Sequence, residues 1–445
     1  MTRNLLLILA TVFAFTVSAQ AAPKPNVVCI LVDDLGYSDL SSFGGTDIRT
    51  PAIDGLMQAG LRFDQFYSNC TVCTPTRASL LTGRYPDLVG APGVIRQWDK
   101  DSWGYFNPTG PTMPELMCKA GYHTGMVGKW HLGFESPNVP NDRGFDFFHG
   151  FLADMMDDYW THLRGGVNWM RRNKQEVKAK GHATEVFTRW AIDYVKERAA
   201  DKSKPFFLYL AYNAPHFPIQ PPKDWLEKVR TREPQLDKKR ATNVAFVEHM
   251  DHEIGKFLDA IKELGIAEDT LIVFSSDNGG SIPHGALNGE LRGGKQEHWE
   301  GGIRVPTCAV WPGTIKQGRT NAPGITMDLL PTFCEIAGVK VEHEIDGQSL
   351  APIMLKGAAG DPGRTLIFVR REGNRRYQGR AYYAIRRGPW KLLQNTAFEP
   401  MQLVNLTEDP KEANPKPANS RIAHELSRVL MDHIQKAGKI PWQKP

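Results

Sequence analysis

Four apolar runs of strand length recur along this sequence, and a cluster of polar residues follows each of them directly. The runs are Asn26–Val32, His123–Val127, Phe206–Ala211 and Thr270–Phe274. Strands that are apolar on both faces are typical of a parallel sheet covered by helices. Helical patterns lie between the runs, over Ala183–Ala199 and Ala241–Leu264. The sequence therefore predicts an α/β fold with a mostly parallel sheet.

The polar clusters begin where the predicted strands end. They contain Asp33-Asp34, Gly128–His131, Asn213–His216 and Ser275–Gly280. Ligands of such sheets bind beyond the carboxyl ends of the strands. A single cluster is equally typical of a loop cap, but four clusters at four strand ends predict one convergent site.

Three carboxylates and one amide in these clusters have the chemistry of a metal site. Asp33, Asp34, Asp277 and Asn278 offer hard oxygen ligands, which favour Ca²⁺ or Mg²⁺ over zinc. Adjacent aspartates at a strand end repel one another unless a cation neutralises them. The alternative is a solvated aspartate pair and an ordinary Ser-Asp-Asn-Gly turn.

Positively charged and proton-carrying residues accompany this oxygen cluster. They are Arg77, Lys129, His131, His216 and Lys295. With a divalent cation they describe a pocket for a tetrahedral oxyanion, whose charge needs fixed positive partners. Taken alone, Lys295 could be an exposed loop lysine and His216 a turn residue beside a proline. Lys129 and His131 alternate along a chain leaving a strand, so they point to the same side.

The chain, with 445 residues, is longer than one hydrophobic core usually serves, because cores stop growing at about 250–300 residues. The pattern changes after residue 330 to short alternating runs, and Ser420–Ala437 has the pattern of an amphipathic helix. We expect a catalytic α/β domain over residues 22–330. A small subdomain, with an antiparallel sheet and a helix, should follow over residues 331–445.

The first 21 residues have the pattern of an export signal. Arg3 precedes the apolar run Leu5–Val17, and small residues allow cleavage before Ala22. The run is too short for a membrane anchor, which needs about 20 apolar residues. We expect a periplasmic or secreted protein without a membrane anchor. The net charge of +5 is too small to indicate a nucleic-acid partner.

Six cysteines follow the predicted signal. Cys29 and Cys308 lie in apolar runs and are typical of core residues. Cys70 and Cys73 form a Cys-x-x-Cys pair, whose usual interpretations are a redox couple or half of a zinc site. Neither interpretation finds support, since no second pair of this kind occurs and the chain is far larger than a thioredoxin module.

The segment from Cys73 to Arg84, CTPTRASLLTGR, resembles the signature of the type I sulfatases. The resemblance extends over essentially the whole mature chain. The runs Gly293–Lys295 and Glu300–Pro306 resemble the branch of arylsulfatase A and N-acetylgalactosamine-6-sulfatase. With this segment, seven motifs match in order; the other six are Asp33–Gly36, Gly128–Gly133, Ala214–His216, Ser276–Gly279, the run from Gly293 to Pro306, and Leu406–Pro410. Thr74 and Thr76 replace serines that are common in relatives.

The resemblance implies an alkaline-phosphatase-like α/β/α sandwich with a C-terminal sheet subdomain. It also implies that a formylglycine-generating enzyme oxidises Cys73 to formylglycine, whose hydrate attacks sulfur. One Ca²⁺ per chain would be held by Asp33, Asp34, Asp277, Asn278 and residue 73. Further roles follow by position: Arg77 and Lys129 would hold residue 73, His131 would take a proton from its hydroxyl, and His216 and Lys295 would contact the sulfate and the leaving oxygen.

The activity expected from this resemblance is hydrolysis of sulfate monoesters, with sulfated carbohydrates or aryl sulfates as substrates. A phosphonate or phosphodiester hydrolase and a non-catalytic carbohydrate-binding relative are the alternatives. We expect loops outside the core to select the substrate. The alternative is that these are ordinary surface loops without a role in binding. The candidates in these loops are Trp98, Asp157, Asp158, Tyr159, Trp160, His182, Arg370 and Arg371.

Overall fold

The computed structural model of the protein describes residues 24–372 and 380–444, and the predicted export signal lies outside them. A ten-stranded sheet forms the centre of the molecule. Its order is β13 (Gly318–Thr320), β2 (Leu61–Phe63), β12 (Thr307–Val310), β11 (Thr270–Ser276), β1 (Asn26–Val32), β10 (Phe206–Ala211), β4 (His123–Lys129), β5 (Phe147–Phe151), β8 (Met170–Arg172) and β9 (Gln175–Glu176). The five central strands, β11 to β5, are parallel. The predicted α/β fold is confirmed.

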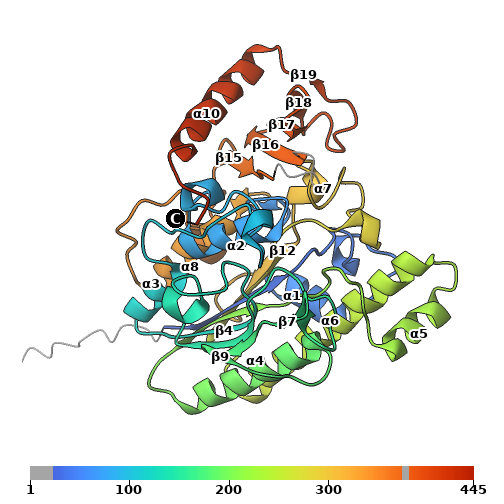
Figure 1. Cartoon of the computed structure of the whole chain (residues 1–445), viewed down its shortest axis with the longest axis vertical. Coiled ribbons are helices and arrows are strands. Elements are labelled where there is room, and N and C mark those ends of the chain that lie inside the picture. Colours follow the sequence, from blue (N-terminus) through green and yellow to red (C-terminus); the bar gives the residue numbers. More distant parts are fainter. Residues whose placement is uncertain (1–23, 373–379, 445) are drawn as a thin grey trace, which may run out of the picture.

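Helices cover both faces of this sheet (Figure 1). Val28 and Ile30 of β1 face a core formed with α1 (Pro51–Ala59), α4 (Ala183–Ala200), α5 (Lys223–Arg232) and α6 (Lys238–Glu263). Val27 and Leu31 face a second core formed with α2 (Cys73–Thr82), α3 (Met113–Lys119), α8 (Leu329–Ala337) and α9 (Ala351–Lys356). Alternating side chains of one strand thus serve two cores, which explains why the strand is apolar throughout.

The strands β4 and β11 run two residues further than their apolar runs, because their polar ends continue the hydrogen-bonded ladder. Gly128 makes this possible in β4. It has a φ of 107°, and a Cβ at this position would lie 1.9 Å from the carbonyl oxygen of Ala211 on β10. Only glycine allows this approach. The next residue, Lys129, is therefore carried to the sheet edge in a fixed position.

A second sheet lies at the C-terminal end of the molecule (Figure 1). It is antiparallel and contains β15 (Thr365–Val369), β16 (Arg380–Arg387), β17 (Trp390–Thr396), β18 (Gln402–Asn405) and β19 (Lys416–Pro417). The helix α10 (Arg421–Ala437) packs on it through Ala423, Leu426 and Leu430. The predicted small antiparallel sheet with its closing helix is confirmed.

The helices α8 and α9 belong to the core of the large sheet, although they follow residue 330. The small sheet starts only at Thr365. We therefore propose that the boundary between the two units lies within residues 357–364. Two short ladders complete the strands, β3 (Phe66–Tyr67) with β14 (Gly324–Ile325) and β6 (Leu163–Arg164) with β7 (Val167–Asn168).

A buried ion cluster joins the two units. Lys391 of β17 donates to Glu300 Oε1 at 3.0 Å and to Glu412 Oε1 at 2.8 Å. Glu300 opens the short helix α7 (Glu300–Ile303), and its backbone N–H donates to Glu412 Oε2 at 2.6 Å. All three side chains are buried. The C-terminal sheet therefore fixes the chain just beyond Lys295.

Within residues 24–372 and 380–444, no helix combines the length and apolar character that a membrane crossing requires. The six cysteines are all unpaired, and Cys29 and Cys308 are buried in the two faces of the large sheet. These two are core residues, as expected.

Candidate active site

The polar clusters converge at one edge of the large sheet. Because β1, β4, β10 and β11 are parallel, their carboxyl ends lie on the same side, and the residues that follow them meet there. The helix α2 points its N-terminus, with Cys73, at the same place. Direct contacts link nine of the ten predicted site residues, and the backbone of the tenth, His131, is bonded to the neighbour of Cys73.

Three carboxylates form the floor of the site. Oxygen atoms of Asp33, Asp34 and Asp277 lie within 4.8 Å of one another, and all three side chains are buried. Asn278 Nδ2 donates to Asp34 Oδ1 at 2.8 Å. Asp33 Oδ1 and Asn278 Oδ1 are buried and have no hydrogen-bond partner. Unpartnered buried oxygens beside clustered carboxylates fit a hard divalent cation, and the donor set contains the oxygen ligands that Ca²⁺ takes.

Two fully buried cations hold these carboxylates. Arg77 donates to Asp277 Oδ2 through Nε at 3.0 Å and through Nη2 at 2.7 Å, and Lys129 Nζ donates to Asp33 Oδ2. Burial alone would raise the pKa of Asp33, but Lys129 and the other nearby cations outweigh it and hold that pKa far below its usual value. Burial and the carboxylate of Asp33 raise the pKa of Asp277. That repulsion is what a bound cation would relieve.

Tyr209 of β10 is a supporting residue that sequence reasoning missed. Arg77 Nη1 donates to the Tyr209 hydroxyl oxygen at 3.3 Å and to the carbonyl oxygen of Lys129 at 3.1 Å. The sequence contained a signal for this role, because a tyrosine in an otherwise apolar strand carries a hydroxyl group that needs a hydrogen-bond partner when it is buried. With these contacts the guanidinium of Arg77 has one fixed orientation.

Cys73 is the first residue of α2 and is buried. Its Sγ, an oxygen of Asp33 and a ring nitrogen of His216 lie within 4.8 Å of one another. Burial raises the pKa of the Cys73 thiol to about 11, although Lys129 acts in the opposite direction. The thiol is therefore protonated at neutral pH, unlike the thiol of a nucleophilic cysteine.

His131 presents one free ring nitrogen. Its Nε2 lies 3.0 Å from the carbonyl oxygen of Ile95, which can only accept, so Nε2 carries the proton. Its Nδ1 is buried without a partner. Burial, with Lys129 and Arg77 nearby, holds the pKa of His131 well below its usual value. The ring is therefore neutral and has an unpaired acceptor at Nδ1.

His216 and Lys295 share Asp34 as their partner. Lys295 Nζ donates to Asp34 Oδ2 at 2.6 Å, and His216 Nε2 lies 3.6 Å from the same oxygen. Burial lowers the pKa of His216 to about 4, and Lys295 adds to this effect. Burial alone would lower the pKa of Lys295, but Asp34 outweighs it and raises that pKa. Lys295 is thus the charged member of the pair.

Two site residues have left-handed backbone conformations. Asp34 has a φ of 68° and His131 a φ of 62°. Such conformations are costly for residues with a side chain and persist where the surrounding structure enforces them, often at functional sites. At Asp34 the backbone N–H donates to Asp277 Oδ1 at 3.2 Å. The strained turns direct both side chains into the site.

Three of the residues predicted to select the substrate are buried structural residues, so this prediction is wrong for them. The Tyr159 hydroxyl donates to the carbonyl oxygens of Asn213 and His216 at 2.8 and 3.0 Å. His182 Nε2 bonds to the carbonyl oxygen of Gln220 at 2.9 Å. Arg370 donates to the buried carboxylate of Glu372. Sequence alone could not separate a buried aromatic or arginine from an exposed one.

The other five candidates have mixed surroundings. Trp98 and Trp160 are about half exposed. Asp157 pairs with Arg164 at 2.8 Å, and Asp158 Oδ1 accepts the backbone N–H groups of Trp160 and Thr161 at 2.9 and 2.7 Å. Arg371 is partly buried. None of these five contacts a catalytic candidate directly in the contacts described.

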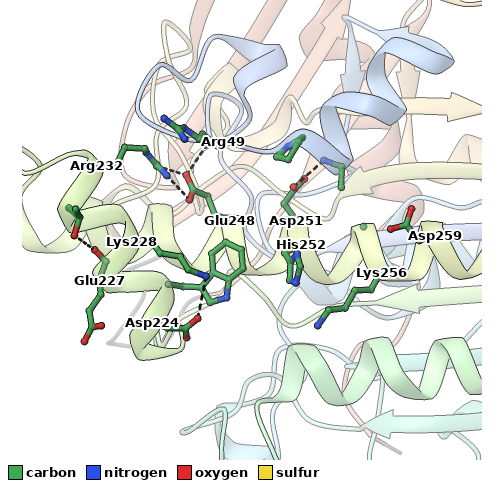
Figure 2. A pocket seen from close by; sticks show the side chains of 15 residues that line it. Arg49, Asp224, Glu227, Lys228, Arg232, Glu248, Asp251, His252, Lys256 and Asp259 are labelled. Atoms are coloured by element: carbon green, nitrogen blue, oxygen red, sulfur yellow. Dashed lines mark hydrogen bonds and ion pairs between the residues drawn. The ribbon is translucent and has the colours of Figure 1, made fainter.

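A hollow of about 960 Å³ lies away from this site, between α1, α5 and α6 (Figure 2). Most of its charged groups have partners in the protein, either an opposite charge or a backbone N–H group. Arg232 Nη1 donates to Glu248 Oε2 at 3.1 Å, and Asp251 Oδ1 accepts the backbone N–H of Ile53 at 2.8 Å. This hollow contains none of the predicted site residues, so we regard its ion pairs as structural.

Hydrolases and transferases of tetrahedral oxyanions are the class that this fold and site define. The carboxyl edge of a mostly parallel sheet carries ligands for a hard cation, and three cationic side chains and two imidazoles surround the same point. Such a set can bind a sulfate or phosphate group, stabilise its charge and exchange protons with it.

Comparison with known families narrows this class. Residues 25–339 match the Sulfatase family, and residues 294–437 match the family described as N-sulphoglucosamine sulphohydrolase, C-terminal. The chain belongs to the sulfatase family and is a sulfatase.

Individual relatives agree with this assignment. The chain is 31% identical to arylsulfatase A of Bos taurus over 451 residues, covering 90% of this chain and 84% of that protein. It is 33% identical to N-acetylgalactosamine-6-sulfatase of Homo sapiens over 376 residues, covering 79% and 70%. Among solved structures, Ps i-CgsB in complex with k-i-k-neocarrahexaose has a TM-score of 0.85 at 32% identity and covers 95% of both chains. The phosphonate monoester hydrolase of Agrobacterium radiobacter shares the fold, with a TM-score of 0.67 at 19% identity.

Proposed function

We propose that this sulfatase hydrolyses sulfate monoesters of carbohydrates and that residue 73 acts as its nucleophile after oxidation to formylglycine. The position of Cys73 carries the proposal. It lies at the N-terminus of α2, among the oxygen cluster, Lys129 and His216, where a helix dipole and cations favour a bound anion. A formylglycine-generating enzyme is the maturation partner that this requires.

The raised pKa of the Cys73 thiol supports a modified residue. An unmodified thiol with a pKa of about 11 is a poor nucleophile at neutral pH. The hydrate of formylglycine would supply one hydroxyl for the attack on sulfur and a second for release of sulfate by C–O cleavage. Position 73 thus needs cations to hold the hydrate and a base to deprotonate it, and both lie nearby.

Asp33, Asp34, Asp277 and Asn278 would hold one Ca²⁺, with residue 73 as a further ligand. Such a cation would supply charge stabilisation at the nucleophile and at a sulfate oxygen. The formal charges of the site cancel, because three buried carboxylates face the three cations Arg77, Lys129 and Lys295. A divalent cation would therefore add the net positive charge that attracts a sulfate ester. Lys129 favours the ionised form of Asp33, and Arg77 orients the carboxylate of Asp277.

We assign the base of the release step to His131. Its Nδ1 is a buried ring nitrogen without a hydrogen-bond partner, and its Nε2 is bonded to the carbonyl oxygen of Ile95. A neutral imidazole with one unpaired nitrogen can take the proton of the second hydroxyl of residue 73. Thr74, the neighbour of Cys73, donates to the carbonyl oxygen of His131 at 3.2 Å and keeps the two residues in register.

We assign the leaving oxygen to His216 and Lys295. Both side chains converge on Asp34, and they are the most exposed of the charged and imidazole groups in the site, so the departing alcohol passes them. Lys295 is charged and can stabilise or protonate the alkoxide. His216 takes part in protonation once the bound sulfate ester adds negative charge beside it.

Carbohydrate is the substrate class that the relatives favour. N-acetylgalactosamine-6-sulfatase acts on a sulfated sugar by its name, and Ps i-CgsB was solved with a neocarrahexaose. Export, as the sequence predicts, would bring the enzyme to such polymers. Mass spectrometry of the exported protein tests the predicted export signal, and a mature N-terminus at Ala22 is the expected result.

The test is a rate comparison on matched esters. Protein matured with a formylglycine-generating enzyme is assayed on defined sulfated saccharides and on 4-nitrophenyl esters of sulfate and of phenylphosphonate. We expect the highest kcat/KM on a sulfated saccharide and a higher value for the aryl sulfate than for the phosphonate. The reverse order on the two aryl esters would favour the phosphonate hydrolase and contradict the proposal.

A further inference from the structure

Two of the ten candidate residues of the catalytic site are more exposed to solvent than the others. Eight of the ten residues have at most 3% of their surface exposed. The exceptions are His216, which is 9% exposed, and Lys295, whose side chain is 14% exposed. A substrate therefore enters past His216 and Lys295, and whatever flanks these two residues contacts the alcohol part of the ester.

An aromatic pair, with Phe217 exposed and His284 partly buried, flanks this opening. Phe217 follows His216 directly, and its ring stacks on the ring of His284 with centroids 4.4 Å apart and an angle of 22° between the planes. Phe217 is 44% exposed, and the neighbouring Ile282 is 50% exposed. Phe217 is absent from the apolar clusters formed by the described residues. The pair is thus not part of the core.

Hydrogen bonds tie both members of this pair to the catalytic residues. The Phe217 carbonyl oxygen lies 2.6 Å from His216 Nδ1. His284 Nδ1 lies 2.9 Å from Ser281 Oγ, and the preceding residue, Gly280, accepts the backbone N–H of Lys295 at 3.0 Å. The backbone of Phe217 is thereby held beside His216, and the segment that carries His284 is held beside the backbone of Lys295.

We propose that Phe217 and His284 form a stacking platform for the sugar ring that carries the sulfate. The proposal rests on the proposed function and deepens it by naming the residues that recognise the saccharide. Pyranose rings present faces of C–H groups that pack on aromatic rings, and a large rigid ring loses little entropy on binding. A platform at the mouth would orient the ring while its sulfate reaches residue 73.

A stacking platform gives a reason for the exposure of Phe217 and Ile282, which the stability of the fold does not require. Leaving a phenylalanine and an isoleucine half exposed beside a polar opening gains nothing for the stability of the chain, whereas an apolar surface next to a polar site is typical of ligand contact. The burial of Tyr159 and His182 removes them from this role and leaves Phe217 and His284 as an aromatic surface at the opening.

The experiment compares three variants: Phe217→Ala, Phe217→Tyr and Phe398→Ala. Phe398, 86% exposed in the turn after β17, is the matched control. Two probes are used, N-acetylgalactosamine 6-sulfate and k-i-k-neocarrahexaose, with inorganic sulfate as an inhibitor that fills only the anion site. The same Phe217 changes are also placed in a Cys73→Ala background, where binding is measured by calorimetry without turnover.

We expect Phe217→Ala to raise KM for the saccharide about 10-fold, with kcat and the Ki of sulfate nearly unchanged, because one stacking contact is worth roughly a factor of ten. Phe217→Tyr should keep the wild-type KM, and Phe398→Ala should change nothing. An unchanged KM in Phe217→Ala would overturn the platform. An equal loss in kcat and in sulfate inhibition would overturn it too, since the residue would then act through His216.

The binding measurements separate this proposal from the proposed function. If mature wild-type protein hydrolyses neither saccharide but the Cys73→Ala protein binds one of them, and Phe217→Ala weakens that binding, the platform stands and the assigned activity fails. If the Cys73→Ala protein binds neither saccharide, the platform is overturned.

Discussion

Cys73 and Cys70 are close in sequence and both buried, but their surroundings differ. Cys70 packs with Val72 and Val94, whereas Cys73 faces Asp33 and His216. We expect Cys73→Ala to lower kcat/KM by at least about 10³-fold while the protein stays folded, because the nucleophile is lost. Cys70→Ala, the matched control, should stay within a few-fold of wild type. Peptide mass spectrometry of active protein should find the aldehyde or its hydrate at residue 73, and an active Cys73→Ala protein would contradict the assignment.

His131 and His216 should give different kinetics because they serve different steps. With His131→Ala, the first alcohol should be released in a burst of one equivalent per chain, followed by slow turnover. With His216→Ala, no burst is expected, and the loss should be largest for sugar alcohols and smaller for nitrophenol, which needs little protonation. Each acid or base contributes about 10²–10⁴-fold. Equal losses in both variants for every leaving group would refute this division.

At the scale of elements, α7 and the chain from Lys295 to Glu300 depend on the C-terminal sheet. We expect Lys391→Met to destabilise the protein by about 3–5 kcal/mol, because Glu300 and Glu412 would be left buried without their cation. Activity at low temperature should also fall, since Lys295 loses its fixed support.

The matched control for this prediction is Lys411→Met, which removes the exposed pair with Glu290. Its effect on the free energy of unfolding should stay below about 1 kcal/mol. Denaturant unfolding of both variants measures the difference. A Lys391→Met protein as stable as the control would show that the buried cluster does not hold the two units together.

At the scale of the whole molecule, Ca²⁺ should raise the thermal stability. A ligand bound only by the folded state stabilises it by about 2.7 kcal/mol at 100 times its Kd. Chelation should therefore lower Tm and activity together, and Ca²⁺ should restore both, with one Ca²⁺ per chain found by metal analysis. Zinc at full occupancy, with Ca²⁺ unable to replace it, would contradict this.

Two variants show whether the Ca²⁺ effect arises at the proposed site. Asp277→Asn should abolish the Ca²⁺ dependence of Tm. Asp251→Asn alters a buried carboxylate elsewhere, one that accepts backbone N–H groups of α1, and should lower Tm but keep the Ca²⁺-dependent shift. If Asp277→Asn kept the shift, the cation would have to bind elsewhere in the protein.

Much of the architecture could be predicted from the sequence, because local patterns determine it. The apolar runs matched β1 and β10 to the residue, since a strand buried on both faces must be apolar throughout. Parallel strands then bring their polar ends to one edge, which groups the site residues that follow strands. Cys73 and Arg77 lie on α2, and the role of Cys73 came from the resemblance to the sulfatase signature. The boundary of the catalytic unit was harder to place, because the sequences of α8 and α9 do not tell which of the two sheets these helices pack against.

What the sequence determined by itself were the strands, the chemistry of the site residues and the family. Only the tertiary structure decided which atoms are free. His131 Nε2 bonds to the carbonyl oxygen of Ile95, 36 residues earlier in the chain, while its Nδ1 stays unpaired, and Phe217 stacks on His284 from a distant segment. Side-chain burial and hydrogen bonding depend on contacts between distant segments, and a residue type says nothing of those neighbours until the chain has folded.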